Sequence, residues 1–142
     1  IGSWINHEIP NSPDKISLSN DLVFRDDNFF LAVDGSIELL GYATNRWNVS
    51  SDEEILFLLR NISKQIENIT EFNVDSYSVS VRNENKLYLI KYSARIDSED
   101  SVGQYISAYV ITPGNKAVVV FVTNKYQEEL EETYLDILGS IR

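Results

Sequence analysis

The sequence predicts an α+β fold, an α/β/α sandwich in which two main helices flank a central, mainly antiparallel sheet of six to seven strands. Three observations lead to this fold class. Short apolar segments alternate with turn residues through most of the chain, and two apolar series at helical spacing mark one helix in the middle and one at the end. The segment Ala117–Val122 is apolar on both faces, so it needs cover on both sides of the sheet. Two helices on opposite faces would provide that cover.

The length of 142 residues fits a single domain that can bury a core without disulfides. We assign residues 1–20 to an N-terminal extension with a short strand around His7–Ile9. Pro10 and Pro13 interrupt regular strand pairing there. Residues 21–142 form the single predicted domain.

Three apolar runs open the domain: Leu22–Phe24, Phe29–Val33 and Ile37–Tyr42. Turn residues separate them, with Asp26–Asn28 between the first two runs and Asp34–Gly35 before the third. Asp-Gly between apolar runs is a strong hairpin signal, so we expect two or three strands in this part of the chain.

The first helix is predicted to begin at Ser51, which forms a capping box with Glu54 ahead of an apolar series. Asp52 and Glu53 add negative charge where the helix dipole favours it. The spacing places these apolar residues on one face of the helix: Ile55, Leu59, Ile62, Ile66 and Ile69.

Strands fill most of the second half of the chain. Tyr77, Val79 and Val81 alternate with serines and predict a half-buried strand. Residues 83–85 turn the chain, and the next strand has Leu87 on one face and a long apolar series on the other. That series is Tyr88, Ile90, Tyr92, Ala94 and Ile96.

After a polar loop at 97–103, a further strand is predicted at Tyr105–Thr112. Pro113 and Gly114 predict a type II turn, in which Gly114 supplies the positive φ. The chain then enters Ala117–Val122, which we expect at the centre of the sheet.

The closing helix has an apolar face and an acidic face. The apolar face carries Tyr126, Leu130, Tyr134, Ile137, Leu138 and Ile141. Glu128, Glu129, Glu132 and Asp136 lie away from it and are the candidate partner-binding residues. Such an acidic run is most often a solvated face, and its alternative role is to dock a basic partner.

The charge balance is strongly acidic, with 22 Asp and Glu against 12 Lys and Arg, a formal net charge of -10 and a pI near 4.4. Such a surface repels phosphate backbones and anionic headgroups, so we expect neither nucleic acid nor an anionic membrane surface as a partner. The mean hydropathy of -0.21 and the lack of any apolar run of about 18 residues predict no membrane span.

The residues needed for most catalytic chemistry are missing. The chain has no Cys, and its one histidine, His7, has no second histidine with which to hold a metal. No glycine-rich phosphate loop occurs. The acidic residues at 97–100, and Asp26 and Asp27 with Asp34, are candidate cation ligands, but their spacing fits no EF-hand loop and favours solvated loops. We therefore expect no enzyme, no cofactor, and no catalytic or metal-binding residues.

Several local patterns follow one another in a familiar order: a helix opening at Ser51–Glu54, the strands Tyr77–Val81 and Leu87–Ala94, a strand start at Gly103–Ile106, and a last turn at Ile137–Ile141. From about Phe24 onward, this order resembles the PsbP-like fold family, which includes PsbP, Mog-type proteins and DcrB-like bacterial lipoproteins.

The resemblance implies a non-enzymatic binding domain of a secreted or membrane-tethered bacterial protein, located in the cell envelope or outside the cell. Its implied partner is an unidentified protein or small ligand, and a membrane would be involved only through a removed lipid anchor or signal segment. The chain contains no Met, which predicts a processed form or a piece of a longer protein.

Two other functions stay open. The first is an acidic inhibitor or immunity-type protein that neutralises a basic partner through the Glu128–Asp136 face. The second is a carboxylate-based hydrolase, because two catalytic carboxylates need not be close in sequence.

Overall fold

The computed structural model describes residues 24–34, 37–44, 46–66, 68–96 and 101–141. The elements in chain order are β1 (Phe24–Asp34), β2 (Ile37–Thr44), α1 (Asp52–Lys64), β3 (Ile69–Arg82), β4 (Asn85–Ile96), β5 (Gly103–Ile111), β6 (Ala117–Val122), the 3₁₀ turn η2 (Glu128–Leu130) and α2 (Glu131–Gly139). The predicted extension at 1–20 with His7, and the acidic loop at 97–100, lie outside the described residues.

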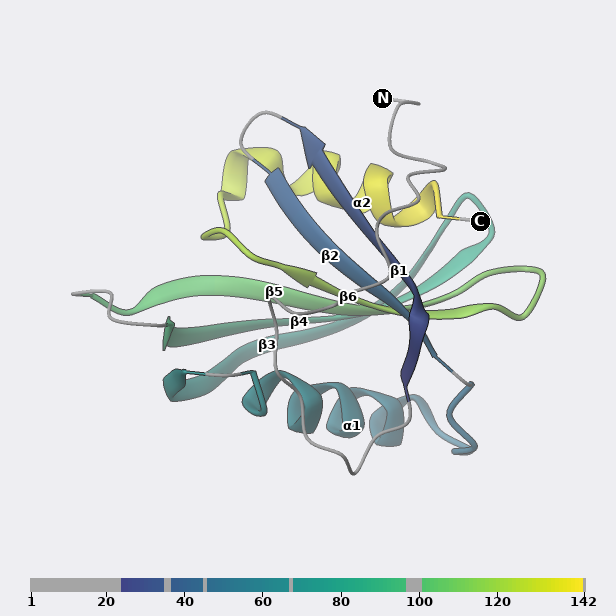
Figure 1. Cartoon of the computed structure of the whole chain (residues 1–142), viewed down its shortest axis with the longest axis horizontal. Helices are drawn as coiled ribbons and strands as arrows, with labels where there is room; N and C mark the ends of the chain where they lie inside the picture. The colour runs from purple at the N-terminus through teal and green to yellow at the C-terminus, as the bar shows by residue number, and fades with distance from the viewer. Residues whose placement is uncertain (1–23, 35–36, 45, 67, 97–100, 142) are drawn as a thin grey trace.

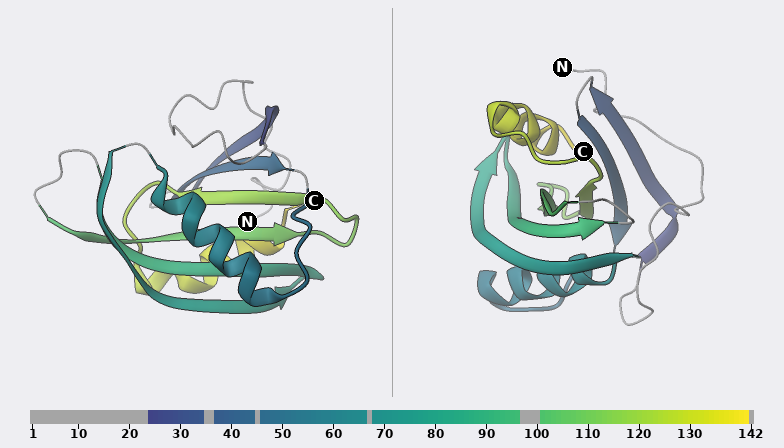
Figure 2. Two further views of the ribbon diagram at one scale, coloured as in Figure 1. Left: turned by 90° about the horizontal axis from the view of Figure 1, so that it is seen from below. Right: turned by 90° about the vertical axis from the view of Figure 1, so that its left-hand side faces the viewer.

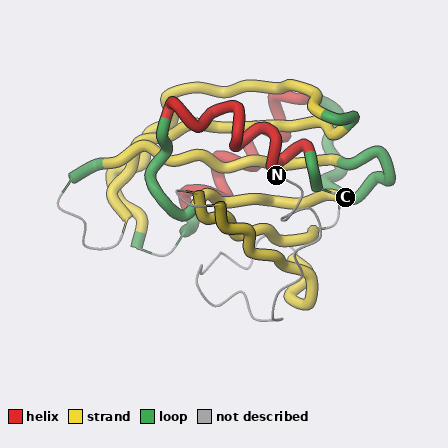
Figure 3. Tube along the Cα trace, turned by 90° about the horizontal axis from the view of Figure 1, so that it is seen from above, coloured by secondary structure: helices red, strands yellow, loops and turns green. Residues whose placement is uncertain are grey.

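The strands form one antiparallel sheet in the order β1-β2-β6-β5-β4-β3. The helices α1 and α2 lie on opposite sides of it (Figure 1). The sheet is strongly twisted, and the β1–β2 hairpin departs steeply from the direction of β3 and β4 (Figure 3). The prediction of an α+β fold with an antiparallel sheet and two helices is confirmed.

The two halves of the chain meet where β2 pairs with β6, from Leu39 opposite Val122 to Thr44 opposite Ala117. Strand β6 is therefore an inner strand, and all six of its residues are buried. Its predicted place at the centre of the sheet is confirmed, because a strand apolar on both faces is stable only under cover on both sides.

The first hairpin pairs β1 with β2 as far as Asp34 opposite Ile37, while the predicted turn residue Gly35 lies outside the described residues. The turn predicted at Asp26–Asn28 is wrong. β1 runs through these residues, and the pairing register shifts between Phe24 and Phe29. Extra residues in one strand of a pair are accommodated as a bulge without ending the strand.

Each face of the sheet has its own core, as the alternation in β4 predicts. Leu87 and Leu89 point to the α2 side, where β2, β5 and β6 add apolar side chains against Tyr134, Ile137 and Leu138. The other face of β4 carries Tyr88, Ile90, Tyr92 and Ala94, which pack with β5 and β6 against Ile55, Leu59 and Ile62 of α1. The two views in Figure 2 show both helices along the sheet.

The start of α1 is confirmed and its end is not. Ser51 is the N-cap, and its Oγ accepts a 3.2 Å hydrogen bond from the backbone N–H of Glu54. The helix ends at Lys64, because Asn68 takes a φ of 63° and redirects the chain into β3. Ile69, predicted on the helix, starts β3 and still packs on the same core.

Two turns shape the second half. Between β3 and β4, Asn83 and Glu84 have φ values of 51° and 69°, which makes a two-residue type I′ turn. The predicted type II turn at Pro113–Gly114 is wrong. The positive φ, 66°, belongs to Asn115, so this connection is a three-residue hairpin loop, closed by a 2.9 Å bond from Thr112 N to Lys116 O.

The C-terminal end of α2 is held by one buried side chain, Asn85 at the start of β4. Its Nδ2 lies 3.1, 3.2 and 2.8 Å from the carbonyl oxygens of Leu138, Gly139 and Ile141. The last carbonyls of a helix have no partner within it, so a buried amide donor at this place satisfies them.

Candidate functional site

The most unusual surface of the molecule is one face of β3. This strand forms an edge of the sheet, and β4 is its one neighbour among the described strands. Tyr77, Val79 and Val81 point to the α1 side and are 50%, 39% and 68% exposed. We call these three residues the apolar strip. An edge strand with exposed apolar side chains is a template for pairing with another strand.

The apolar strip is exposed because α1 does not reach it. Tyr77 and Val79 stand opposite Ile90 and Tyr88 of β4, which are buried under the helix. Only the first half of β3, from Ile69 to Val74, contributes partly buried apolar residues to that core. The prediction of a half-buried strand is therefore wrong for residues 76–81, all of which are exposed.

β3 is irregular in its first half and regular in its second. Two register shifts precede Ser76, and Glu71 has a φ of 55°. From Ser76 to Arg82 the strand pairs with β4 without a shift. The segment Ser76–Val81 has no charged residue, although edge strands generally carry charges that prevent strand addition.

The regular part of β3 is bounded by two anchored charges. Asp75 lies at the second register shift, and its Oδ2 accepts hydrogen bonds from Ser93 Oγ at 2.6 Å and Gln104 Nε2 at 2.9 Å. At the other end, Arg82 binds Glu132 and Asp136 of α2, at 3.1 and 2.7 Å. The strand is thus fixed to the body at both ends of the segment that carries the apolar strip.

The four predicted partner-binding residues do not form one free acidic face. Glu128 and Glu129 lie exposed on η2. Glu132 and Asp136 both bind Arg82, and these hydrogen bonds raise the pKa of the Arg82 guanidinium. Glu132 and Asp136 therefore join α2 to β3, while Glu128 and Glu129 face solvent.

A tyrosine, a lysine and a carboxylate meet at the start of α1. Asp52 Oδ1 accepts hydrogen bonds from the Tyr88 hydroxyl at 2.7 Å and from Lys86 Nζ at 3.0 Å. These two bonds lower the pKa of Asp52, while burial raises the pKa of Tyr88. The cluster fastens the start of α1 to β4.

The other face of the sheet has a similar cluster. Glu131 Oε1 accepts from Lys91 Nζ at 2.9 Å and from the Tyr126 hydroxyl at 3.0 Å, and the Lys91 ammonium lies 4.6 Å from the centre of the Tyr126 ring. The bonds from Lys91 and Tyr126 lower the pKa of Glu131. This cluster joins the start of α2 to β4.

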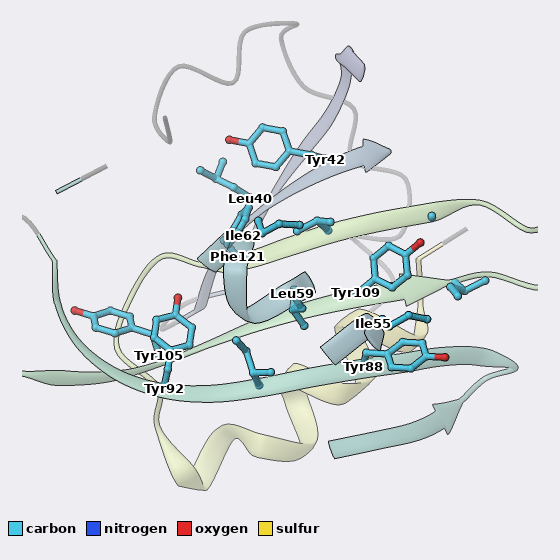
Figure 4. Packing of buried hydrophobic residues seen from close by; sticks show 14 of the residues in the cluster. Leu40, Tyr42, Ile55, Leu59, Ile62, Tyr88, Tyr92, Tyr105, Tyr109 and Phe121 are labelled. Atoms are coloured by element: carbon cyan, nitrogen blue, oxygen red, sulfur yellow. The ribbon is translucent and has the colours of Figure 1, made fainter. Parts of the chain in front are cut away.

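Buried tyrosines fill the core under α1 (Figure 4). Burial raises the pKa of Tyr92 to about 12, and its hydroxyl lies 3.3 Å from the Oγ of buried Ser107. Tyr109 accepts a bond from the backbone N–H of Trp47 at 3.0 Å, and the two rings stack with centroids 3.9 Å apart. These aromatic residues form packed core with internal hydrogen bonds.

An open depression of about 540 Å³ lies beside the end of α2, between the β3–β4 turn and the β5–β6 loop. Its polar lining includes Asn85, Thr112 and Ser140. All three bind neighbouring backbone groups: Asn85 the α2 carbonyls, Thr112 Oγ1 the N–H of Lys116, and Ser140 Oγ the carbonyl of Ile137. The polar side chains of the lining therefore stabilise the end of α2 and the β5–β6 loop.

Within the described ranges, no three histidine, cysteine, aspartate or glutamate side chains are grouped so that they could hold a metal ion. None of the helices in those ranges is long and apolar enough to cross a membrane. The candidate cation ligands at 97–100 lie outside these ranges.

No protein-family model and no curated protein matches this sequence.

The sequence pattern predicted a half-buried strand with the apolar strip on its buried face. One local signal sets it apart from an inner strand: small serines fill every alternate position of Ser76–Val81. The inner strand Ala117–Val122, by contrast, has apolar residues at both sets of positions. Alternation with small polar residues therefore indicates an edge strand.

Proposed function

We propose that this chain is a non-enzymatic binding domain that takes up a strand of another polypeptide along β3. The observation that carries the proposal is the apolar strip on a regular, uncharged edge strand. Strand addition uses backbone hydrogen bonds for affinity and alternate side chains for specificity. Tyr77, Val79 and Val81 supply such side chains on one face.

The chemistry of the described side chains supports binding over catalysis. The carboxylates of Asp52, Glu71, Glu131, Glu132 and Asp136 each pair with a lysine or an arginine of the same chain. Each of these pairs joins two elements of the fold, which is a structural role. No observation of this kind favours the carboxylate-based hydrolase.

The cellular setting remains part of the proposal. The resemblance to the PsbP-like family supports an α/β/α sandwich of six to seven strands that works in a bacterial cell envelope or outside the cell, tethered through a lipid anchor or secreted. An apolar core on each face of an antiparallel sheet is what an α/β/α sandwich requires.

The test compares three proteins as bait for an envelope extract: the wild type, the double variant Val79→Lys/Val81→Lys, and Phe57→Lys. Phe57 is a matched control, because it is 58% exposed and lies on α1, away from the edge strand. We expect a partner that the wild type and Phe57→Lys retain and that the double variant loses. Equal retention by all three baits would contradict binding through β3.

The acidic inhibitor or immunity-type protein is the second candidate, favoured by the exposure of Glu128 and Glu129 on η2. In that case Glu128→Lys/Glu129→Lys should abolish binding to a basic partner, and binding should weaken as salt rises. Binding that survives both changes would exclude this role for η2.

A further inference from the structure

We infer that the strand added to β3 is β3 of a second copy of this chain, paired antiparallel about a two-fold axis at Val79. This inference rests on the proposed function and names its partner. Two such copies would join their sheets into one continuous sheet. An isologous contact of this kind requires a surface that complements itself.

The apolar strip complements itself in this register. With Val79 opposite Val79 of the second copy, Tyr77 stands opposite Val81, and Val81 stands opposite Tyr77. All three residues of the apolar strip point to the α1 side, as their pairing with β4 shows. Aromatic and β-branched residues make favourable cross-strand pairs, and here each exposed member gains one. On the other face, Ser78 stands opposite Ser80.

The charges at the ends of the regular segment also complement each other. Asp75 and Arg82 both lie on the α2 side, as their contacts with Ser93 and with α2 show. In the two-fold register, Arg82 stands opposite Ser76 of the second copy, next to Asp75. At both ends, a guanidinium that also binds Glu132 and Asp136 thus lies next to a carboxylate of the other copy, and no charged residue lies between the two ends.

The backbone of β3 has the matching arrangement. The type I′ turn closes on Arg82 opposite Asn85, which is a hydrogen-bonded pair in a two-residue hairpin. Hydrogen bonding alternates along an antiparallel pair, so the N–H and C=O groups of Tyr77, Val79 and Val81 point away from β4. The residues of the apolar strip are thus the ones whose backbone groups bind an added strand.

Net charge acts against this association. Each copy carries -10, and two like-charged bodies repel more strongly when little salt screens them. The self-association should therefore strengthen as salt rises. A contact between the acidic η2 and a basic partner has the opposite salt dependence, which distinguishes the two.

Cysteine cross-linking tests the register, because the chain has no Cys of its own. In the paired dimer, the Cα atoms of the two Val79 residues lie about 5.5 Å apart, within disulfide range. Those of the two Val81 residues lie about 14 Å apart. Under mild oxidation we expect Val79→Cys to form a covalent dimer, and Val81→Cys and Phe57→Cys to stay monomeric.

A mixture of Tyr77→Cys and Val81→Cys supplies a second test of the register. We expect disulfides between the two variants and none within either alone. If Val79→Cys cross-links no faster than Phe57→Cys, or the mixture forms no mixed disulfide, the two-fold pairing is overturned.

Sedimentation of the unlabelled protein then measures the association. We expect Val79→Lys/Val81→Lys to raise the dimer dissociation constant about tenfold or more, and Phe57→Lys to leave it unchanged. A wild type that is monomeric at every salt concentration overturns the inference. The bait experiment separates this failure from a failure of the proposed function. If the wild type is monomeric but still retains an envelope protein that Val79→Lys/Val81→Lys loses, the proposed function stands. If no bait retains such a protein, the proposed function is overturned as well.

Discussion

Tyr88 and Asp52 join the sheet to the first turn of α1 through a 2.7 Å hydrogen bond, which the Tyr88 hydroxyl donates to the carboxylate. Lys86 binds the same oxygen. Asp52 thus serves both the helix N-terminus, where negative charge is favoured, and the contact with β4.

Asp52 should make the fold sensitive to acid. Its pKa is lowered below 3.8 by the bonds from Tyr88 and Lys86, so the folded state favours the charged carboxylate. The stabilisation from the charged carboxylate is present above the pKa of Asp52 in the unfolded chain. It is lost as the pH falls through the pKa of Asp52 in the folded state. In urea unfolding at pH 2 to 6, Asp52→Asn should lose less stability on acidification than the wild type. Glu53→Gln, a neighbouring exposed change, should follow the wild type.

Asn85 should be among the most sensitive positions in the protein. Asn85→Ala removes the donor for three carbonyl groups at the end of α2 and should lower the free energy of unfolding by about 2–3 kcal/mol. Asn85→Asp keeps the shape of the side chain but offers no donor, so it should lower the free energy of unfolding by a similar or larger amount. Asn83→Gly is the control, since Gly accepts the φ of 51° at that position. A stable Asn85→Asp variant would contradict this reading of the contact.

Gly139 should not tolerate alanine, although it lies in a helix. A Cβ there would lie 2.4 Å from Cγ of Arg82 and 3.2 Å from the Arg82 carbonyl oxygen. Arg82 would have to leave Asp136, so we expect Gly139→Ala to destabilise the fold by about 1–3 kcal/mol. The Arg82→Ala/Gly139→Ala double variant should show a loss smaller than the sum of the single losses. Strict additivity would mean that the two residues do not meet.

Tyr92 should control stability at high pH. The fold keeps its phenol neutral, with a pKa of about 12 against an ordinary value of 10.0. Its contribution to stability is therefore complete below about pH 10 and disappears as the pH rises through the folded pKa. Between pH 10 and 12, Tyr92→Phe should lose less stability than the wild type. Exposed Tyr77→Phe should not differ from the wild type in this respect.

The apolar strip should matter little for the stability of the single copy. Val81 is 68% exposed, so Val81→Lys should change the free energy of unfolding by no more than about 0.5 kcal/mol in dilute solution. Val119→Lys on β6, where the side chain is fully buried, should prevent folding. A large loss for Val81→Lys at low concentration would show that this part of β3 supports the fold itself.

Sequence patterns predicted the elements whose local signals agree with their packing. The Ser51–Glu54 capping box marks the true start of α1, and the two-sided Ala117–Val122 run marks an inner strand. The alternation from Leu87 to Ala94 assigned both faces of β4 correctly. In each case, the pattern of apolar residues shows which faces of the element must be buried.

The errors arose where position in the sheet decides the outcome. Tyr77, Val79 and Val81 have the alternation of a half-buried strand, and the serines between them are the one local sign that β3 lies at an edge of the sheet, beyond the reach of α1. Ile69 continues the helical spacing, yet the turn at Asn68 ends that segment. The hairpin after Thr112 places its left-handed residue at Asn115, one position later than a Pro-Gly pair suggests.

The pairing of β2 with β6 has a consequence for how the protein is made. The β1–β2 hairpin is synthesised well before β6, the strand that pairs with β2. At a translation rate of about 5–20 residues per second, several seconds pass before β6 leaves the ribosome and can cover Leu39, Leu40 and Tyr42. During that interval the hairpin is a natural substrate for a chaperone. Because β2 pairs with β6, the core cannot close until the ribosome has made every strand between them.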